Sequence, residues 1–345
     1  MMKAAIFHGP RDVRLEEIEV PCAGPGEVVV EVDVALTCGT DRKMYLRGHP
    51  LFEPPFVFGH EFAGTVAEVG PGVDRFEPGM RVVAANSAPC GHCFYCMREA
   101  PSLCEDLFLR LSGAFAECID VPAPIVEKNL LRIPDGVSSR DAALVEPLAC
   151  VVHGVERSGI RLGDTVVVNG AGPIGLMFVR LASRRAGTVI ATDVRDDRLA
   201  RAGRLGADTV LNVSAIGDPA AAVKERANGG RGADVAIEAV GLPETWESTI
   251  RMVRRGGAAN LFGGCAGGTS IRVDTGLIHY SEVQIRGVFH HTPRHVRAAL
   301  DLIAGGIVTG DELVTGELPL DRLDDILDAL VGHEGIKTAV RPRGS

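Results

Sequence analysis

Three side chains of the types that bind metal ions lie in the first part of the sequence. Cys38 opens the segment Cys-Gly-Thr-Asp, and His60 and Glu61 stand side by side further along, after Gly59. A thiol, an imidazole and a carboxylate are ligands that zinc binds readily. For Cys38 or His60 alone, an ordinary buried residue is the better explanation. Their combination with the motifs that follow favours a metal site.

Four cysteines form the most specific local motif of the chain, C-x2-C-x2-C-x7-C, at positions Cys90, Cys93, Cys96 and Cys104. Four thiolates close a tetrahedral zinc site without an open position, so such a zinc is structural. An iron–sulfur cluster also takes four thiolates, but this spacing differs from the ferredoxin patterns. We therefore predict a lobe, at about residues 88–106, that is ordered by a structural zinc.

A glycine-rich segment follows the apolar run at 165–169 and precedes a predicted helix. Its G-x-G-x-x-G pattern contains Gly170, Gly172, Pro173, Ile174 and Gly175. The glycines allow the backbone to approach a pyrophosphate, and the start of the helix supplies N–H groups and a favourable dipole. In this setting, after a strand and before a helix, the pattern indicates a dinucleotide site.

The next predicted strand ends in Asp193, which is placed to bind the two ribose hydroxyls and to repel a 2′-phosphate. This favours NAD over NADP. Arg195 and Arg198 act in the opposite direction, because an arginine can accept that phosphate. We expect Arg198 to contact the cofactor, together with residues near the ends of later strands, which are Val240, Gly263, Val288 and Phe289.

The elements that position these residues change in character along the chain. Short strands with Gly/Pro turns predict a β-rich first domain, in which 114–126 is also expected to be strand. A helix is predicted over 138–155, where Glu146 is equally well explained as a surface residue or as a buried one that meets a cation. Alternating strands and helices then predict a parallel sheet, and two helices after Pro293 return to the first domain. The predicted domains are 1–153, 154–292 and 293–345.

Composition narrows the class of protein. A chain of 345 residues, 46% hydrophobic and 23% charged, should form about two globular domains. The net charge of −9 argues against a nucleic-acid partner. We expect no membrane span, because no long apolar run is present, and no signal peptide, which predicts a cytoplasmic location. Nine cysteines without an export signal favour metal binding over disulfides.

Taken together, these motifs resemble those of the zinc-dependent medium-chain dehydrogenases, in the sorbitol/threonine dehydrogenase branch, over essentially the whole chain. The resemblance implies an α/β protein with a GroES-like β-rich catalytic domain and a Rossmann domain built on a doubly wound parallel sheet. It also implies that Cys38, His60 and Glu61 hold a catalytic zinc, that Glu146 binds this metal or its water, and that Thr40 relays a proton.

The implied reaction is hydride transfer between a secondary alcohol, polyol or sugar-like, and NAD, in a homodimer or homotetramer. Two positions depart from the family pattern: Lys43 stands where a histidine is usual, and His290-His291 where an arginine that contacts the polyol is usual. The histidines would bind substrate hydroxyls or form a subunit or domain contact. The alternatives are a threonine- or sugar-phosphate-type dehydrogenase and, more distantly, a non-catalytic NAD-binding zinc protein.

Overall fold

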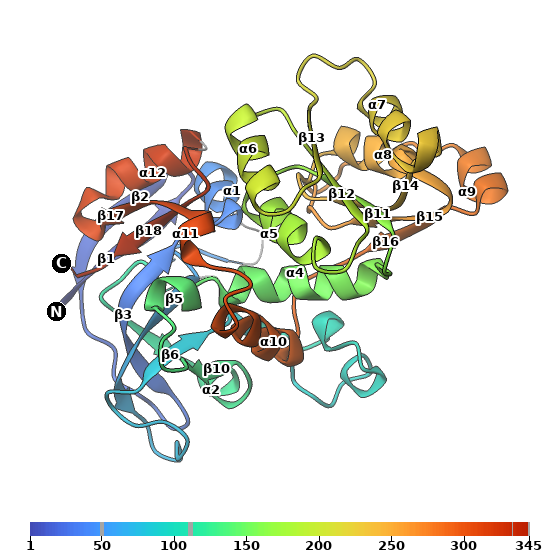
Figure 1. Ribbon diagram of the computed structural model, residues 1–345. Helices are drawn as coiled ribbons and strands as arrows, with labels where there is room; N and C mark the ends of the chain where they lie inside the picture. The colour runs from blue at the N-terminus through green and yellow to red at the C-terminus, as the bar shows by residue number, and fades with distance from the viewer. Residues whose placement is uncertain (49–51, 110–112, 333, 344–345) are drawn as a thin grey trace. The chain divides into compact units, whose positions relative to one another are not determined.

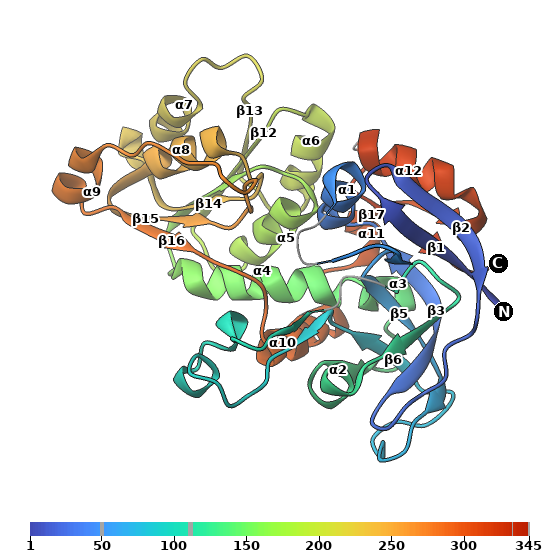
Figure 2. The ribbon, with the colours of Figure 1, turned by 180° about the vertical axis from the view of Figure 1, so that it is seen from behind.

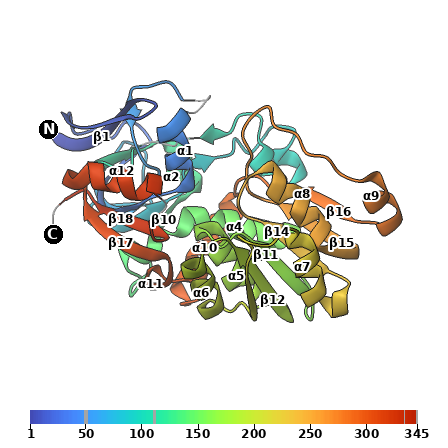
Figure 3. The ribbon, with the colours of Figure 1, turned by 90° about the horizontal axis from the view of Figure 1, so that it is seen from above.

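The chain folds into two compact units, one of which is discontinuous in sequence. The computed structural model describes residues 1–48, 52–109, 113–332 and 334–343. The first unit comprises Met1–Ala149 and His291–Ser345, and the second comprises Cys150–His290. Both ends of the chain lie in the first unit (Figure 3). Within the described ranges, no helix is long and apolar enough to cross a membrane.

The first unit is built on a seven-stranded mixed sheet (Figure 2). Its strands run in the order β10-β6-β5-β3-β18-β17, and β9 also pairs with β3. These strands are β3 (Val28–Leu36), β5 (Glu61–Val69), β6 (Arg81–Ala84), β9 (Cys118–Val121), β10 (Leu130–Arg132), β17 (Val314–Pro319) and β18 (Lys337–Arg341). The smaller sheets contain β1 (Met2–Gly9), β2 (Asp12–Ile18) and β4 (Phe56–Val57), and the pair β7 (Ser87–Ala88) and β8 (Phe108–Leu109). The prediction of a β-rich first domain is confirmed.

Aromatic packing fixes the backbone just before His60. The ring of Phe58 lies 5.7 Å from that of Phe115 and 5.9 Å from that of Phe7, between centroids. Gly59 has a φ of +80°, and a Cβ at this position would lie 2.3 Å from the Phe115 ring. Only glycine combines this backbone conformation with so close a contact. The core therefore determines where β5 begins, and with it the placement of His60 and Glu61.

Short helices complete the first unit. They are α1 (Gly39–Arg47), α2 (Ala123–Lys128), α3 (Ser139–Ala142), α10 (Pro293–Ala304), α11 (Gly310–Leu313) and α12 (Leu323–Gly332). Helix α12 packs against α1 and against strands β17 and β18. The segment after Pro293 therefore contributes two strands to the first unit in addition to the predicted helices, and these strands were not predicted.

The second unit is a six-stranded, all-parallel sheet (Figure 1). Its strands are β11 (Thr165–Asn169), β12 (Thr188–Asp193), β13 (Thr209–Asn212), β14 (Ala233–Glu238), β15 (Val253–Leu261) and β16 (Gln284–Gly287). The order β13-β12-β11-β14-β15-β16 is that of the doubly wound dinucleotide-binding fold, with its switch point between β11 and β14. The predicted fold class is confirmed.

Helices cover both faces of this sheet, as right-handed crossovers require. They are α5 (Pro173–Ala182), α6 (Asp196–Arg204), α7 (Pro219–Arg226), α8 (Pro243–Met252) and α9 (Thr275–Ser281). In Figure 1, α7 and α8 lie above the sheet and α5 lies below it. Strand β11 is completely buried, which explains its unbroken apolar run.

Two predictions of secondary structure are wrong. The predicted helix over 138–155 is two helices, α3 and α4 (Val145–Ser158). A continuous helix would force the ring of Pro147 against the carbonyl of Ala143, whereas Pro147 is tolerated in the first turn of α4. The predicted strand over 114–126 contains only β9, and helix α2 begins at Ala123.

Candidate active site and metal centres

Three of the four predicted ligands of the catalytic zinc meet in the first unit. One ligand atom each from Cys38, His60 and Glu61 lie within 4.8 Å of one another. His60 and Glu61 come from the start of β5, and Cys38 is the N-cap of α1. Burial raises the pKa of the Cys38 thiol, and the Glu61 carboxylate raises it further. A bound cation is what would hold this sulfur as the thiolate that zinc needs.

The carboxylate of Asp41 connects two of these ligands. Its Oδ2 accepts a hydrogen bond from the backbone N–H of Cys38 at 2.9 Å, and its Oδ1 lies 2.9 Å from Nδ1 of His60. Asp41 is completely buried. Burial opposes the imidazolium, but Asp41 and Cys38 outweigh it and raise the pKa of His60. Metal-binding histidines commonly present their second ring nitrogen to a carboxylate in this way, which leaves Nε2 for the metal.

Glu61 is partly neutralised by Lys337 of β18. Lys337 Nζ lies 2.5 Å from Oε2 of Glu61 and donates a second hydrogen bond to the carbonyl of Thr37. Both side chains are buried, with 2% and 0% exposure. Burial would lower the pKa of Lys337, but Glu61 and Cys38 raise it, so the lysine stays charged. Oε1 of Glu61 has no hydrogen-bond partner among the residues that the structure describes, and it is available to a metal.

Glu146 lies in the first turn of α4 and is buried. Its carboxylate does not belong to the close trio of ligand atoms. Burial raises the pKa of Glu146 to about 7, and the nearby His60 opposes this rise. Oε1 of Glu146 lies 3.9 Å from Nε2 of His291, and the same nitrogen lies 3.2 Å from Oδ1 of Asn86. Of the two interpretations of Glu146, the structure favours the buried one.

The cysteine lobe also gathers its predicted ligands. One atom from each of Cys90, Cys93, Cys96 and Cys104 lies within 4.8 Å of the others. Backbone N–H groups point at the sulfurs: Cys90 N lies 3.2 Å from Cys104 Sγ, and Cys93 N lies 3.3 Å from Cys90 Sγ. Hydrogen bonds from the backbone of Cys96 and Glu105 lower the pKa of Cys93 to about 6. Burial, in contrast, raises the pKa of Cys96 to about 12 and also raises that of Cys104. A bound zinc would supply the charge that holds all four sulfurs as thiolates.

The glycine-rich segment connects β11 to α5 as predicted. Gly170 has a φ of +104°, and a Cβ on Gly175 would lie 1.8 Å from the Gly170 carbonyl oxygen. Gly172 is the N-cap of α5, and Pro173 and Ile174 form its first turn. No side chain in the described part of the chain caps this helix, so its first N–H groups are available to a pyrophosphate.

Asp193 ends β12 and is held against the glycine-rich segment. Its Oδ2 accepts from Ala171 N at 2.7 Å, and its Oδ1 accepts from Val194 N and Arg195 N. The guanidinium of Arg195 is paired with Asp197 at 2.7 and 2.9 Å. Arg198 lies beside Gly172, since its Nη1 would be 3.9 Å from a Cβ added to Gly172. Burial lowers the pKa of Arg198.

The remaining predicted residues occupy both units. Val240 and Gly263 follow the ends of β14 and β15, and Val288 and Phe289 follow β16. Phe289 is 58% exposed. Thr40 is in the first turn of α1, where its N–H donates to Cys38 Sγ at 3.4 Å.

The two positions that depart from the family pattern are also placed. Lys43 is exposed on α1. His290 and His291 lie on opposite sides of the boundary between the units.

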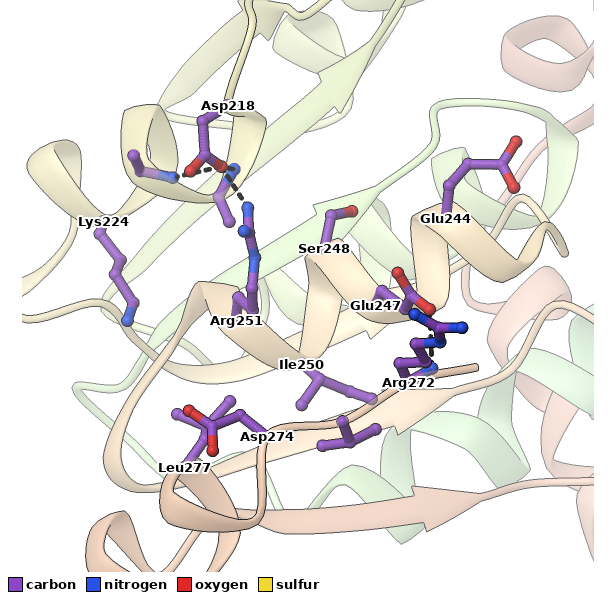
Figure 4. Close-up of a pocket in the computed structure, with 13 residues that line it drawn as sticks. Asp218, Lys224, Glu244, Glu247, Ser248, Ile250, Arg251, Arg272, Asp274 and Leu277 are labelled. Carbon is purple, nitrogen blue, oxygen red and sulfur yellow. Dashed lines mark hydrogen bonds and ion pairs between the residues drawn. The ribbon is translucent and has the colours of Figure 1, made fainter. Parts of the chain in front are cut away.

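A separate cavity of about 530 Å³ lies between α7, α8 and residues 272–277 (Figure 4). Asp218 caps α7 and pairs with Arg251, while Glu247 accepts a hydrogen bond from Arg272 N. None of the predicted site residues lines this cavity. Because these charged groups stabilise the surrounding elements, we assign the cavity no part in the reaction.

The roles of three residues were not predicted from the sequence. Lys337 stands in the apolar run Ile-Lys-Thr-Ala-Val, and a lysine in a buried strand signals a buried partner. Asp41 lies three positions after Cys38, which is the spacing of a helix cap. Glu238 ends a buried strand at the edge where parallel sheets bind their ligands.

Comparison with known proteins agrees with this architecture. Residues 24–135 match the alcohol dehydrogenase GroES-like domain, and residues 173–305 match the zinc-binding dehydrogenase domain. Sorbitol dehydrogenase of Bacillus subtilis is 34% identical, over 99% of this chain and 97% of that protein. Erythritol/L-threitol dehydrogenase of Mycolicibacterium smegmatis is 33% identical, over 99% and 98%. A solved structure from Sinorhizobium meliloti, a zinc-binding dehydrogenase bound to NADP, superposes with a TM-score of 0.89 at 32% identity, covering 99% of both chains.

Proposed function

Because the chain belongs to the family of zinc-binding dehydrogenases with a GroES-like domain, we propose that it oxidises a secondary alcohol of a polyol or sugar-like molecule with NAD. It is an NAD(P)-dependent alcohol dehydrogenase of this family. The observation that carries the proposal is the close trio of Cys38, His60 and Glu61 in a chain that also has a complete dinucleotide fingerprint. The sorbitol and erythritol dehydrogenases among its relatives support the polyol.

In this proposal Cys38, His60 and Glu61 hold the catalytic zinc, and Glu146 binds the same metal or its water. When bound, the zinc supplies a Lewis acid that lowers the pKa of the alcohol. Asp41 holds the ring of His60 in one orientation, and Lys337 limits the negative charge of the ligand set. Thr40, beside Cys38, carries the released proton outward through its hydroxyl.

The second zinc is proposed to be structural and bound by Cys90, Cys93, Cys96 and Cys104. The surrounding lobe contains few buried side chains and exposes Phe94, Met97 and Leu103 by half or more. A segment without a core of its own gains most of its order from the metal. This zinc takes no part in hydride transfer.

NAD is the proposed cofactor, although a relative binds NADP. Asp193 places a carboxylate beside the glycine-rich segment, and a 2′-phosphate there would be repelled. Arg195, one of the two arginines that could attract that phosphate, is paired with Asp197. Arg198, beside Gly172, is proposed to contact the cofactor, together with Val240, Gly263, Val288 and Phe289.

The first unit is proposed to be the catalytic domain and the second the NAD-binding domain, which associate as a homodimer or homotetramer through the NAD-binding domains. Strand β16 is an edge of the parallel sheet, and Ile285 on it is 37% exposed. The neighbouring helix α9 exposes Ile278 and Tyr280, the latter by 82%. An exposed apolar edge strand is a surface that a second copy can extend.

The experiment that tests this function measures cofactor reduction by absorbance over polyols, sugars, sugar phosphates and threonine. Each substrate is tested with NAD and with NADP, and zinc is determined on the same preparation. Turnover of polyols with NAD, at one catalytic and one structural zinc per chain, supports the proposal. Turnover confined to threonine or to sugar phosphates overturns the substrate class. A chain that holds one zinc and oxidises none of these compounds overturns the assignment of Cys38, His60 and Glu61.

A further inference from the structure

Glu238, the last residue of β14, has a completely buried carboxylate that is surrounded by donors. Oε1 accepts hydrogen bonds from Val240 N at 2.9 Å, Gly241 N at 2.8 Å and Thr245 Oγ1 at 2.6 Å. Oε2 accepts from Gly263 N at 3.2 Å. Val240 and Gly241 belong to the loop after β14, Thr245 to the first turn of α8, and Gly263 to the loop after β15. A buried carboxylate that accepts hydrogen bonds from four donors acts as a structural connector between the segments that supply them.

The loop after β15 is held from a second side as well. Trp246 of α8 donates its Nε1–H to the carbonyl of Gly263 at 2.8 Å. The two loops also touch through their backbones, since a Cβ on Gly263 would lie 2.4 Å from Gly241 N. Glu238 and Trp246 therefore fix both polar groups of Gly263. The loops form one rigid piece whose geometry depends on the carboxylate.

This piece lies next to the glycine-rich segment. A Cβ on Gly170 would meet Cγ2 of Val240 at 2.5 Å, so Val240 packs directly on the turn expected to bind the pyrophosphate. Asp193, on the β12 side of β11, marks the adenosine half of the cofactor. The other half must extend across the ends of β14 and β15, because a dinucleotide spans the switch point between β11 and β14.

We propose that Glu238 is a positioning residue for the nicotinamide half of the cofactor, because its hydrogen bonds hold the loops that carry Val240 and Gly263. The inference rests on the proposed binding of NAD. It predicts that the two halves of the cofactor depend differently on Glu238. The adenosine half would bind on the other side of β11, away from the hydrogen-bond partners of Glu238 among the described residues.

The test compares Glu238→Gln with the wild type in calorimetric titrations of the zinc-loaded protein with NADH and with AMP. Glutamine has the same shape and keeps one oxygen, but its NH2 group would face either the Gly263 N–H or the donors around Oε1. We expect the Kd for NADH to rise about tenfold or more, while the Kd for AMP stays unchanged. Equal NADH affinity in variant and wild type, or an equal loss for NADH and AMP, overturns the inference.

Asp234 offers a matched control on the same strand. It lies at the opposite end of β14 and accepts hydrogen bonds from Thr165 N, Asn228 Nδ2 and Arg254 Nε at 2.6–2.9 Å. Asp234→Asn is expected to lower Tm without changing the Kd of NADH or AMP. If Glu238→Gln does not fold, the Thr245→Val variant is used instead, because it removes one donor to Glu238. It must then raise the Kd of NADH and leave the Kd of AMP unchanged.

Wild-type protein that binds neither NADH nor NADPH would overturn the proposed function itself. If the wild type binds NADH and the Glu238→Gln variant binds it with the same Kd, only the role of Glu238 is overturned.

Discussion

Glu61 and Lys337 form an ion pair in which both charged groups are buried. Such a pair is costly to assemble, because both ions leave water, and it is costlier still to break. The pair would also set the charge of the proposed ligand set, because the lysine balances one of the two anions, Cys38 thiolate and Glu61 carboxylate, that a bound zinc would face. The two residues are far apart in sequence, so only the folded chain reveals their relation.

Replacing Lys337 by methionine should therefore destabilise the protein strongly. We expect Lys337→Met to lower the free energy of unfolding by about 3–5 kcal/mol, since Glu61 is left as an unpaired buried charge. Urea denaturation of the zinc-free protein measures this. The double variant Lys337→Met/Glu61→Gln should recover most of the loss. A Lys337→Met variant as stable as the wild type would show that Glu61 is protonated in the fold.

Asp41 should matter for the metal rather than for the helix that it caps. Asp41→Asn keeps an oxygen for the N–H of Cys38 but removes the negative charge beside His60. We expect a loss of about 10–100-fold in zinc affinity at this site, the usual cost of losing an outer partner of a ligand. Competition with a chelator measures this affinity. Ser138→Ala, which removes the cap of α3, should leave it unchanged.

Strands, helices and turns were predictable to the extent that their signals are local. The sequence around Gly170 combines an apolar run, a turn and a helix start, and all three are found where predicted. Strands β17 and β18 were missed because β18 takes its place beside β3, a pairing that no local pattern reveals. The same holds for the site: its ligand types were readable, whereas the partners Asp41 and Lys337 follow from packing.

Cofactor choice belongs to the element that carries Asp193, the end of β12. We expect Asp193→Asn to lower kcat/KM for NAD about 10–100-fold, because hydrogen bonds to a charged acceptor are lost. The value for NADP should rise relative to NAD, because the repulsion of the 2′-phosphate is removed. Steady-state kinetics with both cofactors measure the ratio.

Asp208 gives the matched control for this prediction. Its carboxylate accepts from Val189 N at the opposite end of β12, and Asp208→Asn should leave the preference unchanged. An unchanged ratio in Asp193→Asn as well would assign the selection of cofactor to Arg198.

At the scale of the whole molecule, the parallel sheet has two edge strands, β16 and β13, on which a second copy could pair. We expect Ile285→Lys on β16 to lower the mass measured by light scattering, since a charge at the edge opposes strand pairing between copies. Val210 is similarly exposed, by 43%, on β13 at the other edge. Val210→Lys should leave the mass unchanged. The reverse result would place the interface on β13.

The discontinuous first unit has a consequence for the order in which the chain can fold during synthesis. Residues 150–290 form a contiguous unit, which can fold as soon as it has left the ribosome. The first unit lacks β18 until residues 337–341 are made. Until then β3 lacks one neighbour and Glu61 lacks its cation. The nascent first unit therefore keeps an unpaired edge on β3 until β18 is made, which is after the second unit is complete.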